Sequence, residues 1–462
     1  MEAPTNKISS FSLLCINIGF IIGAGIFTSL PIACTYVGSG IVLCFVVAFV
    51  ESILRNMPSI LPGASIPCNG GFYMHMCRLV HPIAGYFIFI DTILMTLILT
   101  LLGTMFAVYV NMLFPANPLI VAMLAIIVFG VIGCFGLQTG AKVQNILVIL
   151  LIVALGVFIV YGMMSIDSTK INFKSIISPE GMTLTSFGAA LGMLTSALGG
   201  GFQGMILADN LENPRKQIIS SFILSTSIVA IFYAAMGVVT VGVNSSDPVD
   251  SLGAVAKINM PTAVYLFFIV CGALFALATT INGMLLTTSA NLDMMARDKL
   301  LPSCFAKKNR FGQNPWCIIF IVVVVCGILV LNIDITLLMS VSSVLTILSG
   351  VLKFLPVLKL PKRYPHCYKN AMVRLPQWMV YGMIFIALAL CVYEGYSLVV
   401  EAQSSLWWGV LATLAVCFGY FLLRVLFVKK KTGENLLENM AAPYKPWEEM
   451  EATYAAIDNA EV

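Results

Sequence analysis

The sequence predicts an all-α membrane protein with twelve transmembrane helices, in two inverted blocks of five followed by a final pair. Three observations support this fold class. Of 462 residues, 60% are hydrophobic and only 10% are charged, against about 25% charged in a soluble domain. Apolar stretches of about 20 residues recur along the chain, and the first and sixth carry glycine-rich interruptions. A soluble protein cannot hide so much apolar surface, so an ordinary soluble enzyme is excluded.

Twelve apolar stretches are long enough to be considered as membrane spans. The first is rich in glycine and lacks the form of a cleavable signal peptide, so we expect it to remain in the mature protein. The stretches are Phe11–Tyr36, Ile41–Met57, Pro82–Phe114, Leu119–Gly136, Val143–Met164, Leu184–Asn210, Ile218–Val243, Ala263–Leu292, Trp316–Leu331, Ile335–Leu358, Met379–Val400 and Leu406–Val428.

The spans divide the chain into four parts. Residues 1–10 are an N-terminal segment, residues 11–358 hold helices 1–5 and 6–10, and residues 359–428 hold helices 11 and 12 with the preceding loop. Residues 429–462 form a polar tail, which we expect to be mobile. The prolines and glycines of 58–81 predict an irregular loop that partly re-enters the membrane. The polar segments 165–183 and 244–261 are expected to cover an external mouth.

Basic residues indicate the orientation. All but three of the 25 Lys and Arg residues fall on the N-terminal side of the twelve spans; the exceptions are Lys170, Lys174 and Lys257. Because basic loops stay cytoplasmic, we expect a multi-pass protein of the plasma membrane with both termini inside. His75, His81 and His366 are then expected in cytoplasmic loops. The net charge of +4 suggests no nucleic-acid partner, and the 13 cysteines show no metal or disulfide spacing, so no cofactor is expected.

The most informative feature is where the helices should break. Gly23-Ala24-Gly25 interrupts the first stretch and Gly199-Gly200-Gly201 interrupts the sixth. Each glycine weakens a helix by about 1 kcal/mol relative to alanine, and an open backbone cannot face lipid. Broken helices would therefore line a polar cavity, with N–H groups for an anion at a helix start and carbonyls for a cation at a helix end. This pairing suits a carboxylate and an ammonium on one zwitterion.

The spacing of the two breaks indicates an inverted repeat. The first and sixth spans open two blocks of five, and since five is odd the second block is inverted. Interrupted helices at matching positions of two halves are a pointer to a transporter's binding site. A structural alternative is close helix packing, because Gly19 and Gly23 form a Gly-x-x-x-Gly pair.

At these residues the sequence resembles the amino acid–polyamine–organocation (APC) superfamily of permeases, over about Ile8 to Val428. Ile22-Gly23-Ala24-Gly25-Ile26-Phe27 is similar to the family's Gly-x-Gly-[Ile/Val]-Phe element. Lys299 stands where the family's Ala-Arg-Asp-Gly-x-x-Pro element has glycine. The further matching fragments are Gly70-Gly71-Phe72-Tyr73, Arg78, His81-Pro82, Gly85-Tyr86, Asn213-Pro214-Arg215, Ala296-Arg297-Asp298 and Leu301-Pro302.

The resemblance implies a five-plus-five inverted-repeat (LeuT-type) fold, alternating access, and amino acids or related amines as substrates. Carried over by position, N–H groups of the first break would hold the substrate carboxylate, and carbonyls at both breaks would accept the ammonium. The N–H groups are those of Gly23, Ala24, Gly25 and Ile26, and the carbonyls are those of Ile21, Ala197 and Gly200. Ile22 and Gly201 belong to the same site, Phe202 would close over the substrate, and Met95, Thr96 and Thr100 would line the side-chain pocket.

The coupling ion is left open between sodium and proton. Some proton-linked members of the superfamily carry a lysine in span five, where this chain has Leu151. Thr279 and Thr280 could instead complete a sodium site with Gly23, although hydroxyls in membrane helices more often bond to their own backbone.

Charged residues inside the spans are functional candidates. For Glu51 we expect an ion pair with Arg55 or a gate contact rather than a proton relay. We expect Asp91 to cap or pair with a loop cation. Asp209 and Glu212 precede Arg215 and Lys216, as an inner-gate cluster or as solvated ends. For Glu394, a structural role leads.

The leading hypothesis is a secondary active transporter of amino acids, as symporter or exchanger. Neutral substrates are favoured because no acidic side chain is firmly placed at the breaks. The alternatives are an amino-acid sensor on the same scaffold and a transporter of polyamines or cationic amino acids. A membrane-embedded enzyme lacks a catalytic constellation in this sequence. The expected partners are the amino acid, a coupling ion and the lipid bilayer.

Overall fold

The computed structural model describes residues 7–166, 182–242, 251–331, 335–400 and 404–460. Across these ranges the regular structure is helical, and the only β pairings are two isolated bridges, Ile8 with Leu211 and Asn69 with Leu207. Of the two polar segments expected at the external mouth, 165–183 and 244–261, residues 167–181 and 244–250 lie outside the described residues. The remainder of the second includes a short helix, α11 (Leu252–Asn259).

Each of the twelve predicted stretches contains a helix. By length and composition, eight helices of the described chain could cross a membrane, which makes this an all-α membrane protein. The helices within the stretches are α1 (Ser10–Ile21), α2 (Ala24–Val37), α3 (Ile41–Ser65), α5 (Pro82–Leu113), α6 (Pro118–Cys134), α7 (Leu137–Met164), α9 (Leu184–Ala197), α10 (Pro214–Gly242), α12 (Thr262–Phe267), the π-helical η5 (Phe268–Leu274), α13 (Phe275–Arg297), α14 (Pro315–Val330), α15 (Ile335–Leu352), α18 (Gln377–Val400) and α19 (Ser404–Thr432).

Short helices make the connections. They are η1 (Gly38–Gly40), α4 (Gly71–His75), η2 (Met76–Val80), η3 (Gln203–Ile206), η4 (Ala208–Asn210), η6 (Ser303–Ala306), α16 (Leu355–Arg363), α17 (Pro365–Lys369), α20 (Leu436–Ala441) and α21 (Lys445–Ala460).

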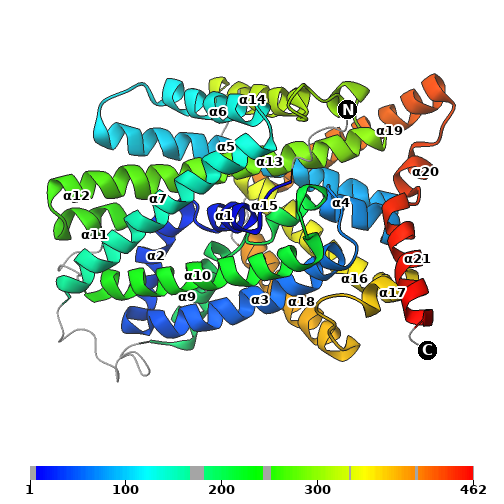
Figure 1. Ribbon diagram of the computed structural model, residues 1–462. Helices are drawn as coiled ribbons and strands as arrows, with labels where there is room; N and C mark the ends of the chain where they lie inside the picture. Colours follow the sequence, from blue (N-terminus) through cyan, green and yellow to red (C-terminus); the bar gives the residue numbers. More distant parts are fainter. Residues whose placement is uncertain (1–6, 167–181, 243–250, 332–334, 401–403, 461–462) are drawn as a thin grey trace.

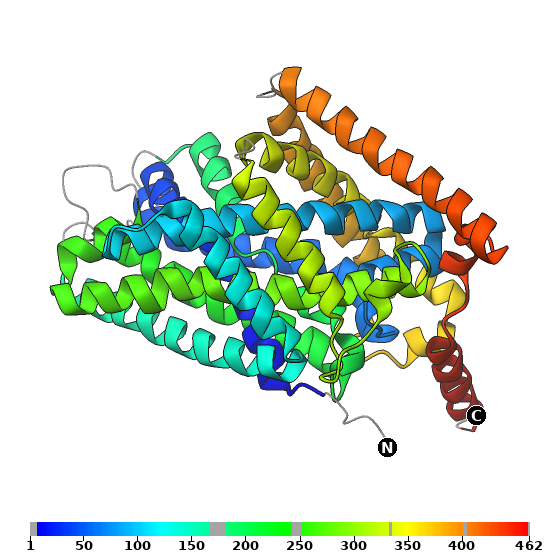
Figure 2. The same ribbon diagram turned by 90° about the horizontal axis from the view of Figure 1, so that it is seen from above.

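The first helix lies in the middle of the bundle. Figure 1 shows α1 enclosed by neighbouring helices, and it packs against α10, α7 and α13, while α2 packs against α9. Leu13, Ile16 and Ile22 of this segment are fully buried. The long α19 instead runs along the outside of the bundle (Figure 2), where apolar side chains such as Leu423 stay exposed. This contrast indicates that the centre of the bundle is built on α1 and that α19 is peripheral.

The expected irregular loop at 58–81 is wrong in its first part. Helix α3 continues through Pro58 and Pro62 to Ser65, and α4 and η2 follow after a short turn. A proline removes one helical hydrogen bond, but neighbouring helices can satisfy the exposed carbonyls, and the last turns of α3 are buried. His75 is also buried in α4 rather than exposed in a loop, and this burial lowers the pKa of its imidazole to about 4.

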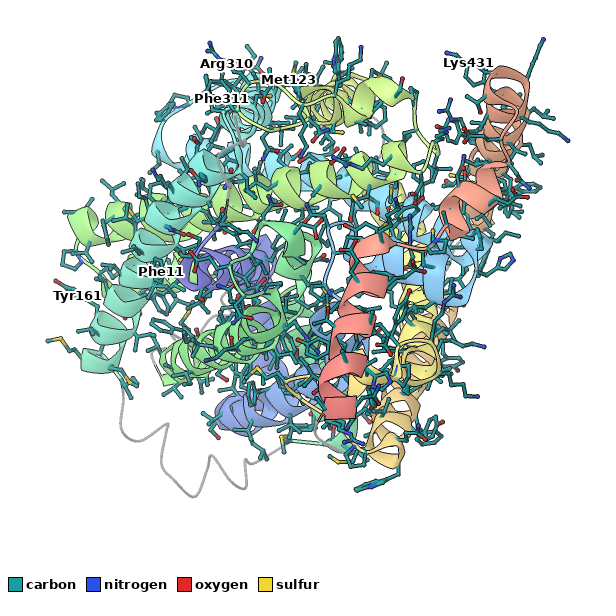
Figure 3. The ribbon with its side chains drawn as sticks, turned by 45° about the vertical axis from the view of Figure 1, so that its right-hand side comes forward. Phe11, Met123, Tyr161, Arg310, Phe311 and Lys431 are labelled. Carbon is teal, nitrogen blue, oxygen red and sulfur yellow. The ribbon has the colours of Figure 1, made fainter. Side chains whose placement is uncertain are left out.

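The C-terminal segment is helical and docked, contrary to the expectation of a mobile tail. Helices α20 and α21 lie across one end of the bundle, coming forward in Figure 3. The Trp447 side chain is fully buried. Its indole donates to the Pro67 carbonyl at 3.2 Å and stacks on His75 with ring centroids 5.3 Å apart. The polar composition of residues 429–462 concealed this single large apolar anchor.

Charged groups hold the far end of α21 to α17. Glu451 accepts from the backbone N–H groups of His366 and Cys367 at 2.9 and 2.8 Å. Asp458 bonds to His366 at 2.6 Å and to Lys369 at 2.9 Å. These partners lower the pKa of the Asp458 carboxyl to about 2, so it remains ionised at neutral pH.

Candidate functional site

The first break lies between α1 and α2. Helix α1 ends at Ile21, α2 begins at Ala24, and Gly23 is extended with φ −103° and ψ −168°. The N-cap residue, Gly23, has no side chain with which to cap α2, and the N–H groups in the first turn of a helix have no acceptors within that helix. The Gly23 N–H, predicted to hold a carboxylate, here donates to the Ile21 carbonyl at 3.0 Å.

Side chains from two other helices cap the end of α1. The Tyr233 hydroxyl of α10 donates to the Ile21 carbonyl at 3.2 Å. The Thr280 hydroxyl of α13 donates to the Gly19 carbonyl at 2.8 Å. The Ile21 carbonyl, predicted to accept a substrate ammonium, therefore accepts two hydrogen bonds from within the protein in this structure.

The second break follows α9. That helix ends at Ala197, and the glycines form a turn in which Gly200 has a left-handed φ of +92°. A Cβ added to Gly200 would lie 3.0 Å from the Phe20 carbonyl oxygen, and one added to Gly201 would lie 2.9 Å from Ile21 Cδ1. The main chain of the second break therefore lies directly against the last residues of α1, so the two breaks are in contact.

The predicted sixth span does not resume as an α-helix after its break. Instead two short 3-10 helices, η3 and η4, continue to Asn210. Their backbone pairs with other segments: Ile8 N–H donates to the Asn210 carbonyl at 2.8 Å, and Gly70 N–H donates to the Ile206 carbonyl at 3.1 Å. The second break therefore offers no α-helical start for an anion, and only α2 supplies one.

Helix α10 contributes polar groups to the breaks that the sequence analysis did not assign. The Asn17 side chain of α1 donates to Ser221 at 3.1 Å and accepts from the Gly204 N–H at 3.0 Å. Thr226 of α10 lies 3.1 Å from the Cβ position of Gly201. The available signal was the set of hydroxyl residues inside the apolar seventh span.

Of the two interpretations of the glycine pair, close helix packing applies to Gly19 and a helix break applies to Gly23. A Cβ on Gly19 would lie 2.1 Å from Gln144 Nε2 and 2.9 Å from Thr279 Cβ, so Gly19 permits close packing. Gly23 instead precedes α2 at the break. A Cβ on Gly25 would meet only Ser29 Oγ, at 4.0 Å, so there is room beside this residue.

Aromatic side chains lie on either side of the breaks along the chain. Beyond the first break, the Phe27 ring lies 6.1 Å from Tyr109 and 6.0 Å from Phe268. Beyond the second break, the Phe202 ring lies 5.7 Å from Phe72, and Lys353 Nζ lies 5.1 Å from the Phe72 ring. Phe202 thus packs on α4 in this structure.

The three residues predicted to line a side-chain pocket lie on α5, which packs against α13 and η5. The Thr96 hydroxyl donates to its own helix, at the Thr92 carbonyl, 3.0 Å away. Thr100 is buried, and its hydroxyl has no hydrogen-bond partner. Met95 is partly buried against the core. No described contact joins these three side chains to the breaks.

Some of the charged residues within the spans have partners other than those expected. Arg55 pairs with Glu394 of α18, not with Glu51, so the expected same-helix pair is wrong. The structural or interface role expected for Glu394 stays a prediction, and this ion pair fits it. Glu51 instead accepts from Thr195, in the last turn of α9, at 2.9 Å. Asp91 pairs with a cation as expected, Lys353 at 2.8 Å, but this lysine lies within the predicted tenth stretch, directly after α15, and not in a loop between stretches.

The proposed inner-gate charge cluster does not form ion pairs. Among the described residues, neither Asp209 nor Glu212 is in a salt bridge. Arg215 donates to the carbonyls of Cys367 and Asn370 at 3.0 and 2.9 Å, and its guanidinium lies 4.5 Å from the Tyr454 ring. This cation therefore holds the C-terminal helix and its neighbour.

Oxygen atoms gather where α13 meets the end of α1. The Thr280 hydroxyl is 2.8 Å from the Gly19 carbonyl and 3.0 Å from the Ala276 carbonyl, and the Thr279 hydroxyl is 2.8 Å from the Ala276 carbonyl. Thr280 Oγ1 also lies 3.4 Å from the Cβ position of Gly23. Backbone carbonyls and hydroxyls of this kind are ligands for a hard cation such as sodium.

Interrupted helices that meet inside a multi-pass bundle are typical of membrane transporters. The chain belongs to the amino acid permease family, whose family model matches residues 8–432, and the resemblance to APC permeases is thereby confirmed.

Known relatives agree on transport and differ in substrate. The methylthioribose transporter of Bacillus subtilis is 23% identical over 86% of this chain and 89% of its own. A branched-chain amino acid permease of Lactococcus lactis is 23% identical over 88% and 92%. An uncharacterized transporter of Mycobacterium tuberculosis is 25% identical over 65% and 68%.

Proposed function

We propose that this permease is a secondary active transporter of neutral amino acids that works by alternating access. The observation that carries the proposal is the contact between the two breaks at Gly200 and Phe20. It brings the start of α2 and the ends of α1 and α9 to one place, where a carboxylate and an ammonium would each find complementary partial charges. Among the described residues, the acidic side chain bonded beside the second break is Glu51, which contacts Thr195 of α9 and not the glycines themselves, and this favours a neutral substrate.

The arrangement of helices supports two inverted halves. Helix α2 follows the first break and packs against α9, which precedes the second break. Ile8 precedes the first break and is hydrogen-bonded to Asn210, which follows the second. The two interrupted spans therefore run in opposite directions with their breaks at one depth. The aromatic groups around Phe27 and around Phe202 would serve as the two gates. We place twelve spans in the plasma membrane with both termini cytoplasmic, because almost all basic residues then lie inside.

Replacing Gly25 by leucine is expected to abolish uptake while the protein stays folded. The Cβ position at Gly25 is open, so a leucine there meets little protein but fills the space at the start of α2. Uptake of labelled amino acids into proteoliposomes measures the effect, after a thermal-stability screen against the twenty amino acids and methylthioribose has identified the stabilising solute. A bound solute raises the melting temperature of the folded protein.

The matched control is Gly156→Leu, because Gly156 of α7 is also surrounded by open space and no described contact joins it to either break. It should transport normally. Normal uptake by Gly25→Leu would contradict the proposed site. Binding of an amino acid without transport would favour the amino-acid sensor. Stabilisation by methylthioribose and by none of the amino acids would mean that the substrate is not an amino acid.

For the coupling ion we propose sodium, held by the oxygens around Thr280. Removing that hydroxyl in Thr280→Val is expected to reduce the sodium-stimulated part of uptake by at least about tenfold, because an oxygen ligand is lost and the loss even of a group that only supports a metal's ligands typically costs about 10- to 100-fold in metal affinity. Thr287→Val is the control, because the Thr287 hydroxyl bonds to its own helix at Gly283. Uptake by the wild type that is independent of sodium and driven by a pH gradient would contradict this site. Glu51 would then be the candidate for a proton relay.

A further inference from the structure

Helix α10 carries one fully buried hydroxyl without a partner. Thr226 is 0% exposed, and its Oγ1 makes no hydrogen bond. A buried hydroxyl left unpaired costs about 1–3 kcal/mol, so such groups are rare in native proteins. The other serine and threonine hydroxyls bonded within this helix donate to its own carbonyls: Ser220, Ser221, Ser225, Ser227 and Thr240.

The unpaired hydroxyl points at the second break. Thr226 Oγ1 lies 3.1 Å from the Cβ position of Gly201, and Ile21 Cδ1 lies 2.9 Å from the same point. Tyr233, two helical turns further along α10, presents its hydroxyl to the Ile21 carbonyl. One face of α10 therefore lies against the region where α1 ends and where the three glycines form their turn.

The surroundings of Thr226 favour a cation. Helix α1 ends at Ile21 and α9 ends at Ala197, and a helix C-terminus carries a partial negative charge. A hydroxyl oxygen has two lone pairs with which to accept hydrogen bonds, and an ammonium is a donor only.

We propose that the Thr226 hydroxyl accepts a hydrogen bond from the substrate ammonium and so determines specificity for solutes that carry one. This inference rests on the proposed function. It adds a side chain of the seventh span to the ammonium end of the site, which is otherwise assigned to main-chain carbonyls.

The test compares Thr226→Val, which keeps the shape and removes the hydroxyl, with Thr226→Ser, which keeps the hydroxyl. The probes are the amino acid that stabilises the wild type most among the twenty and its α-hydroxy acid, in which a hydroxyl replaces the ammonium. Binding is measured by the thermal shift over a range of concentrations. The control is Thr240→Val, on the same helix, whose buried hydroxyl is bonded to Met236 at 2.8 Å.

We expect Thr226→Val to melt at a higher temperature than wild type without solute, because an unpaired group is removed. It should bind the amino acid about 10- to 100-fold more weakly, the usual range for a hydrogen bond to a charged group. Its affinity for the α-hydroxy acid should change much less, and Thr226→Ser and Thr240→Val should bind the amino acid as wild type does. Should the valine variant not fold, Thr226→Ala removes the same hydroxyl.

Two outcomes would overturn the inference: unchanged affinity of the valine variant for the amino acid, or an equal loss for both probes. Failure of all twenty amino acids to stabilise the wild type would instead overturn the proposed function itself. If the α-hydroxy acid binds neither the wild type nor any variant, the amino acid alone decides. A loss of affinity for the amino acid that is confined to Thr226→Val then supports the inference.

Discussion

Replacing Gly200 by alanine is expected to reduce amino-acid uptake by about 100-fold. Gly200 has a φ of +92°, which side chains other than glycine rarely adopt, and its Cβ would lie 3.0 Å from the Phe20 carbonyl oxygen. That oxygen belongs to main chain and cannot rotate away, so the turn has to move away from α1. A displacement of about 1 Å in a pre-organised site costs an enzyme on the order of 100-fold in rate, and we expect a loss of the same order here.

Gly192→Ala is the matched control. Gly192 lies in α9, the helix that precedes the break, and nothing occupies the space around its Cβ position. Alanine there should leave uptake unchanged and strengthen the helix by up to about 1 kcal/mol. Initial rates of uptake in proteoliposomes, normalised to folded protein by size-exclusion chromatography, measure both variants. Equal rates for Gly200→Ala and wild type would show that the contact between the breaks is dispensable.

Replacing Asp298 by asparagine is expected to destabilise the protein by about 3–5 kcal/mol, because it leaves a buried arginine without its counter-charge. The Arg78 guanidinium of η2 makes two hydrogen bonds to the Asp298 carboxylate, at 3.1 and 2.7 Å. Both side chains are almost fully buried, with exposures of 7% and 9%. The pair joins η2 to the end of α13, which are 220 residues apart in sequence.

The measurement is the melting temperature in detergent, together with that of the double variant Arg78→Met/Asp298→Leu. Removing both charges should restore much of the lost stability, because an apolar pair avoids the unpaired buried charge. Glu434→Gln breaks the neighbouring exposed pair with Lys299 and should change little, as surface ion pairs do. A melting temperature of Asp298→Asn equal to that of wild type would contradict the role given to this pair.

The resemblance to the permease family also pointed to a strained residue. Lys299 replaces a glycine of the family's element, and among the described non-glycine residues it alone has a positive φ, of 66°. The glycine of that element thus corresponds to a left-handed backbone position after α13, which side chains other than glycine rarely adopt.

Local features of the site were predictable from sequence. The spans follow from apolar length, because bilayer thickness sets helix length. The breaks at Gly23 and Gly200 follow from glycine's weak helix propensity, and the turn at Gly200 also depends on glycine's access to left-handed φ. The prolines of α3 misled, because burial and neighbouring helices outweighed their local preference. The polar composition of the C-terminal segment also misled, because a buried tryptophan and charged contacts to α17 together dock α21.

By itself, then, the sequence determined that this is a helical membrane protein with its first and sixth spans interrupted, because both properties depend on residues adjacent in the chain. Only the tertiary structure decided that the breaks touch, that Tyr233 and Thr280 cap α1, and that Arg55 pairs with Glu394 rather than with Glu51. Such contacts join segments separated by up to several hundred residues. Their partners are selected by how helices pack, which no local pattern encodes.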